Sequence, residues 1–147
     1  MLIGGVAGFS HGSSYPTYDL DVVYARERNN IARLVDALRE IGVRLRGAPA
    51  DLPFLLDAKT IENGSNFTFI TPHGDFDILG HADGMPGYDE LKASAPVREI
   101  LGLDVHVASI DHLIAMKRAS NRPKDRLMLE EYIVIADEQR KVGETGD

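Results

Sequence analysis

Residues 17–24 read Thr-Tyr-Asp-Leu-Asp-Val-Val-Tyr, which joins two carboxylates to a run of β-branched and aromatic side chains. Such a run favours a strand, and here the strand begins at the first aspartate. Because side chains alternate between the faces of a sheet, Asp19 and Asp21 should project from the same face. Neighbouring carboxylates repel each other unless a cation lies between them, and hard oxygen ligands suit Mg²⁺ or Mn²⁺. The pair predicts a metal site, although an Asp-Xaa-Asp pattern also arises by chance at solvent-facing strand positions.

Glycine-rich sequence precedes this strand. Residues 1–5 form a short apolar run that breaks at Gly4 and Gly5, where the absence of a Cβ atom lets the backbone turn and pack closely. Residues 12–16 (Gly-Ser-Ser-Tyr-Pro) are dense in turn formers. Backbone N–H groups of this second turn, with the Ser13 hydroxyl, are suited to binding phosphate oxygens opposite the carboxylates.

Apolar spacing predicts the remaining elements. Residues 27–41 repeat apolar positions along one helical face and are followed by Gly42, a favoured C-cap. We expect an antiparallel meander of strands at residues 57–61, 66–71 and 75–79. We also expect a short helix over residues 6–11, a loop around 84–87, a strand in 97–107, a helix over 110–119 capped by Ser109, and a last helix from Pro123 to about 139.

Asp75 and Asp77 form a second same-face pair in the last strand of the meander. If this strand lies beside the first pair, Asp77 completes a cluster with Asp19 and Asp21. Two metal ions about 3.5 to 4 Å apart would then bridge the attacking and leaving oxygens at a phosphate. This geometry is suited to phosphoryl or nucleotidyl transfer.

Three segments of the chain stand out together: Gly4-Gly5-Val6-Ala7, His11-Gly12-Ser13 and Thr17-Tyr18-Asp19-Leu20-Asp21. They resemble the signature of the DNA polymerase beta-like nucleotidyltransferase superfamily. The likeness is greatest to small bacterial members of the minimal nucleotidyltransferase and abortive-infection toxin types. It implies that Asp19, Asp21 and Asp77 are the catalytic, metal-binding residues, with Mg²⁺ or Mn²⁺ as the cofactor.

The resemblance also implies a site for a nucleoside triphosphate. The residues it assigns to nucleotide binding are Gly4, Gly5, Gly12, Ser13, Lys117 and Arg122. The last two belong to residues 109–125, which are similar to a segment that small members carry after the core sheet, where basic residues face the nucleotide. Taken from the residues alone, these two cations could equally form a solvated helix end, where positive charge is favoured.

The implied function is transfer of a nucleoside monophosphate to a hydroxyl group on a protein, an RNA or a small molecule. The sequence departs from the pattern at Tyr15, where small relatives often have an arginine, and in starting directly at the first strand, where relatives usually have a helix. A second hypothesis is therefore a non-catalytic nucleotide-binding or toxin–antitoxin interaction module, with a cognate antitoxin or a second copy as partner.

The length and composition of the chain limit the possible classes of protein. The chain has 147 residues, a formal charge of −7 and no cysteine, which excludes disulfides and thiolate metal sites. No apolar run is long enough to span a bilayer, so we expect a cytoplasmic protein without membrane contact. The predicted fold is α+β, a small mixed or antiparallel sheet with helices on one side and a C-terminal helical hairpin. It forms one domain over residues 1–140 with a flexible tail at 141–147.

Overall fold

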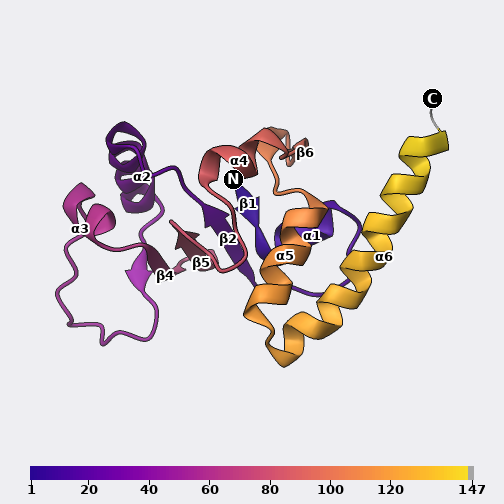
Figure 1. Ribbon diagram of the computed structural model, residues 1–147. Helices are drawn as coiled ribbons and strands as arrows, with labels where there is room; N and C mark the ends of the chain where they lie inside the picture. The colour runs from indigo at the N-terminus through magenta and orange to yellow at the C-terminus, as the bar shows by residue number, and fades with distance from the viewer. Residues whose placement is uncertain (146–147) are drawn as a thin grey trace.

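A five-stranded mixed sheet forms the centre of the computed structural model, which describes residues 1–145 (Figure 1). The strand order is β1-β2-β5-β4-β3. Strands β2 and β5 are parallel, and the other neighbours are antiparallel. The bounds are β1 Leu2–Ile3, β2 Asp19–Val23, β3 Arg44–Leu45, β4 Asn66–Thr71 and β5 Gly74–Leu79. A separate antiparallel pair consists of β6 Val97–Ile100 and β7 Leu103–His106.

Six helices of the described residues surround the strands. They are α1 Gly4–Ser10, α2 Arg28–Glu40, α3 Ala58–Asn63, α4 Tyr88–Ala93, α5 Ile110–Ser120 and α6 Pro123–Thr145. Figure 1 shows α2 and α3 at one end of the sheet and α1, α5 and α6 at the other. No helix in this part of the chain is both long and apolar enough to cross a membrane.

Two apolar clusters hold these layers together. One joins α2 and α3 to the sheet through buried side chains such as Leu38, Ile61 and Ile78. The other joins α1, α5 and α6 to strands β1 and β2 through Leu2, Leu113, Met128 and Tyr132, among others. Since Phe76 and Ile78 face the first cluster, alternation along β5 turns its carboxylates towards the opposite face.

The α+β class, the mixed sheet and the C-terminal helical pair are confirmed, as are the strands at 66–71 and 75–79. The strand predicted at residues 57–61 is wrong, because this segment begins helix α3. Its N-cap is Asp57, whose carboxylate accepts a hydrogen bond from the Thr60 N–H at 2.7 Å. The alternation of apolar residues in 57–61 was too short to distinguish a strand from a single helical turn.

Other elements also differ from the prediction. Residues 97–107 form a hairpin and not one strand, because Leu101 and Gly102 adopt positive φ values of 53° and 79° and reverse the chain. Helix α4 was not predicted. Helix α6 continues to Thr145, so residues 141–145 of the expected tail are helical, whereas the rest of that tail (146–147) lies outside the described residues.

Candidate metal and nucleotide site

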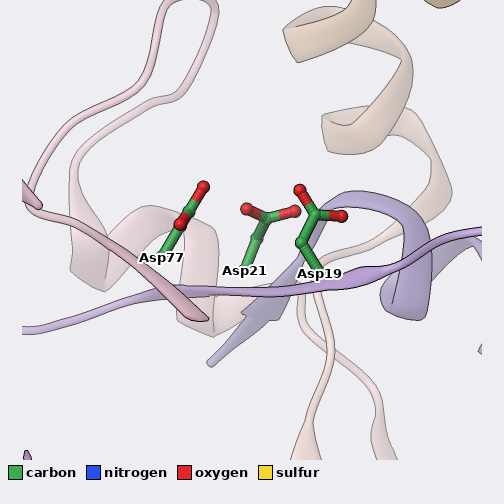
Figure 2. A group of neighbouring side chains, drawn as sticks. All are labelled: Asp19, Asp21 and Asp77. Carbon is green, nitrogen blue, oxygen red and sulfur yellow. The ribbon is translucent and has the colours of Figure 1, made fainter. Parts of the chain in front are cut away.

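Three aspartates meet at the centre of the sheet. The parallel pairing of β2 with β5 places Asp21 opposite Asp77 and Asp19 opposite Asp75. One carboxylate oxygen from each of Asp19, Asp21 and Asp77 lies within 4.8 Å of the others. Figure 2 shows the three side chains pointing to the same side of the strands. The condition set by the sequence, that the two acidic strands be neighbours, is therefore met.

Electrostatic repulsion marks this acidic triad. Burial, followed by the charges of Asp19 and Asp77, raises the pKa of Asp21 from 3.8 to about 6. Burial also raises the pKa of Asp77, against the hydrogen bond and charge of Arg46, which lower it. A divalent cation would offset the repulsion, and three carboxylate oxygens this close are a donor set that fits Mg²⁺ or Mn²⁺.

The start of α1 lies against the triad. Gly4 has a φ of +66°, and a Cβ atom placed on it would lie 2.2 Å from Asp21 Oδ2. A Cβ atom on Gly5 would lie 2.5 Å from the Thr17 side chain. Only glycine lets the backbone come this near to Asp21, and the first N–H groups of a helix have no partner within the helix.

Two adjoining hollows connect the triad to the basic residues of the helical pair. Their volumes are about 320 and 340 Å³, and both are lined by Asp21, Asn66, Lys117 and Arg122. The first hollow also contains Gly4, and the second contains Gly5, Asp19 and Asp77. The structure thus brings together seven of the nine residues that the sequence assigned to the site.

Comparisons with known proteins concern the fold that carries these residues. A scan against models of known protein families finds no match, and a search of curated proteins finds none either. Among solved structures, the chain is similar to the lincomycin-bound crystal structure of the lincosamide antibiotic adenylyltransferase LnuA. The TM-score is 0.56, over 91% of this chain and 85% of that one. The chain has a nucleotidyltransferase fold. At 12% sequence identity the likeness concerns the fold alone.

Gly12 and Ser13 lie at the other end of α1, and neither residue lines the two hollows beside the triad. The Gly12 and Ser13 N–H groups donate to the carbonyls of Phe9 and Gly8, each at 3.0 Å. The Ser13 hydroxyl donates to Glu131 Oε2 at 2.6 Å. In this structure the turn therefore binds groups of the protein itself.

Asp125 is a buried residue beside Lys117 and Arg122 that was not among the residues assigned to the site. Its side chain is fully buried. It accepts hydrogen bonds from Lys117 Nζ and Arg122 Nε at 2.8 Å and from the Ser120 hydroxyl at 2.7 Å. The spacing of Arg122 and Asp125, three residues apart at a helix start, was the available signal.

Arg46 is a second residue that was missed. Its Nη2 donates to Asp77 Oδ1 and, at 3.0 Å, to the Phe69 carbonyl, and its Nε lies 3.2 Å from Asp75 Oδ2. No sequence spacing indicated this contact, because Arg46 follows the edge strand β3 and reaches the triad only through the order of the strands. Tyr15, the departure noted in the sequence, is half-buried and packs on the α1–α5–α6 cluster.

Proposed function

We propose that the protein is a metal-dependent nucleotidyltransferase that moves a nucleoside monophosphate from a nucleoside triphosphate to a hydroxyl group. The observation that carries this proposal is the acidic triad, set beside Gly4 and the two cations Lys117 and Arg122. Carboxylates and cations that line the same hollows suit a ligand that is itself a metal–triphosphate complex. The nucleotidyltransferase fold supports the proposal as an analogy.

Asp19, Asp21 and Asp77 would hold Mg²⁺ or Mn²⁺. When bound, such ions neutralise the charge that develops on the transferred phosphoryl group. The chain's own contribution is to fix three carboxylates on rigid neighbouring strands and to keep Asp21 partly withdrawn from water, so that a cation is attracted strongly.

The triphosphate would lie between the triad and the helical pair. Lys117 and Arg122 would neutralise its oxygens, and the N–H groups of Gly4 and Gly5 would donate to them. Asp77 would bind a metal ion and help to deprotonate the acceptor hydroxyl. Gly12 and Ser13 would contribute only by shaping the turn that leads to Asp19.

A small hydroxyl-bearing molecule is the acceptor class we favour over a protein or an RNA. The similar structure is that of an adenylyltransferase bound to a small antibiotic, and a net charge of −7 does not favour RNA. The same likeness favours ATP as the donor. We infer no role for an antitoxin or a second copy.

Calorimetric titration with ATP, CTP, GTP and UTP in the presence of Mg²⁺ tests the proposal, alongside the double variant Asp19→Asn, Asp21→Asn. We expect the wild-type chain to bind one nucleotide in a metal-dependent manner and the variant to lose this binding. The matched control is the double variant Asp36→Asn, Asp137→Asn, which removes two exposed carboxylates that line neither hollow. Absence of nucleotide binding to wild type in both Mg²⁺ and Mn²⁺ would favour the non-catalytic interaction module instead.

A further inference from the structure

Four carboxylates, and not three, project from the same face of β2 and β5. Asp19 pairs in register with Asp75, and Asp21 with Asp77, so the four side chains form two rows. Backbone register alone would bring all four to one metal site. The group whose oxygens approach within 4.8 Å nevertheless contains Asp19, Asp21 and Asp77 and leaves Asp75 out.

Arg46 contacts both carboxylates of β5. Its guanidinium spans the two β5 carboxylates, with Nε 3.2 Å from Asp75 Oδ2 and Nη2 donating to Asp77 Oδ1. Nη2 also donates to the Phe69 carbonyl at 3.0 Å. The Arg46 backbone N–H donates to the Thr68 carbonyl at 2.9 Å, which extends the pairing of the edge strand and fixes the origin of the side chain. A planar, forked guanidinium can thus place one nitrogen beside Asp75 while another donates to Asp77 and the Phe69 carbonyl.

Two consequences follow for a metal bound at the triad. Asp77 has one oxygen engaged by Arg46, so its other oxygen is the one left to face a metal, as a single ligand. Asp75 forms an ion pair with the guanidinium, whose Nε makes no hydrogen bond among residues 1–145, and it does not enter the cluster. The protein thereby offers few carboxylate oxygens, with room for water and phosphate oxygens, which suits Mg²⁺. Calcium ions prefer six to eight oxygens, often from two-oxygen carboxylates.

We propose that Arg46 is a positioning residue that sets the metal selectivity of the site by holding Asp75 out of the triad and limiting Asp77 to one ligand oxygen. This inference rests on the metal site of the proposed function, but not on the identity of the nucleotide or the acceptor. Loss of Arg46 removes a positive charge, which strengthens binding of every divalent cation. It also releases oxygens that favour the larger cation.

The test is the ratio of Ca²⁺ to Mg²⁺ affinity, measured by displacement of bound Mn²⁺ and followed by electron paramagnetic resonance. In Arg46→Met we expect both affinities to rise and the ratio to shift about tenfold towards Ca²⁺. Arg46→Lys keeps the charge without the fork and should shift the ratio in the same direction. Arg44→Met is the matched control, since Arg44 is exposed two residues earlier and makes no ion pair among residues 1–145.

The double variant Arg46→Met, Asp75→Asn separates ligand choice from simple charge. If Arg46 acts by restraining Asp75, removing the Asp75 charge should return the ratio most of the way to that of wild type. An unchanged ratio in both Arg46 variants, with circular dichroism showing them folded, would overturn the inference. Wild-type protein that binds no divalent cation would overturn this inference and the proposed function together. A selectivity shift without any nucleotide binding would uphold the role of Arg46 and count against the proposed function.

Discussion

Asp21 and Asp125 are two aspartates withdrawn from water whose pKa values move in opposite directions. Burial and the neighbouring carboxylates Asp19 and Asp77 raise the pKa of Asp21 to about 6. Burial acts on Asp125 as well, but hydrogen bonds from Arg122, Lys117 and Ser120 outweigh it and hold the pKa of Asp125 well below its usual value. The same residue type is thus placed once among anions and once among cations.

The difference shows which cluster is complete without a ligand. Asp125 has every oxygen engaged by groups of the protein, so its cluster is a finished structural unit that also fixes Lys117 and Arg122. Among residues 1–145, Asp21 has no comparable donors, and Lys117 and Arg46 act on it only through space. Strongly shifted pKa values of this kind cluster at functional sites, which supports the proposed metal site.

Replacing Asp125 should have the largest effect on stability. Asp125→Asn leaves Lys117 beside a neutral, buried amide, and breaking a buried ion cluster typically costs about 3 to 5 kcal/mol. Urea denaturation measures the free energy of unfolding. Asp111→Asn is the control, because its ion pair with Arg140 is exposed and should be worth less than about 1 kcal/mol. Equal effects of the two substitutions would mean that the Asp125 cluster does not stabilise the fold.

Magnesium should stabilise the wild-type protein and leave the triad variant unaffected. A ligand present at about 100 times its Kd stabilises a folded protein by about 2.7 kcal/mol. We expect a gain of this order for wild type and none for Asp21→Asn, since the variant lacks the central carboxylate. Thermal melts with Mg²⁺ and with a chelator give the comparison. A similar gain in the variant would place the bound ion away from the triad.

In the absence of metal, Asp21→Asn should stabilise the protein. The folded-state pKa of Asp21 lies above its unfolded value of 3.8, so the folded protein loses stability as the pH rises from about 4 to about 6. The cost reaches about 1 to 3 kcal/mol at pH 7, after allowance for the partial exposure of the side chain. Asp21→Asn should recover this amount at pH 7 and little at pH 4, in urea denaturation with a chelator. A destabilised variant at pH 7 would show that the repulsion is already relieved.

The sequence predicted the parts of the site that depend on local pattern. Alternation along strands placed Asp19 with Asp21 and Asp75 with Asp77, and the turn-forming glycines placed a chain reversal before them. The prediction that Asp77 lies beside Asp19 and Asp21 was conditional on the order of the strands, which depends on the whole chain. The parallel pairing of β5 with β2 meets this condition.

The remaining features depend on long-range contacts that no local spacing encodes. Arg46 lies 31 residues from Asp77, and Glu131 lies 118 residues from Ser13, yet both contacts are direct hydrogen bonds. Helix α3 was missed for another reason, since a segment of six residues is too short for periodicity to identify, and only the Asp57 cap fixes it. Patterns thus predicted the carboxylates of the site, but not the partners that orient them.

Glu131 offers the smallest and most discriminating test of the contrast between Asp21 and Asp125. Hydrogen bonds from Ser13 and Ser14 lower the pKa of Glu131 below 4.5, so its contribution to stability is present above about pH 4.5 and is lost as the pH falls. Because the carboxylate is only half-buried, Glu131→Gln should cost only about 0.5 to 1 kcal/mol at pH 7, measured by urea denaturation. Calorimetry with the nucleotide and Mg²⁺ should give the same Kd for the variant and for wild type. A tighter Kd would mean that Glu131 competes with the triphosphate for the Ser14 N–H and for the Ser13 and Ser14 hydroxyls of the turn. The turn would then be a ligand-binding site like the triad. It would not be a cluster that the protein's own groups complete, as they do around Asp125.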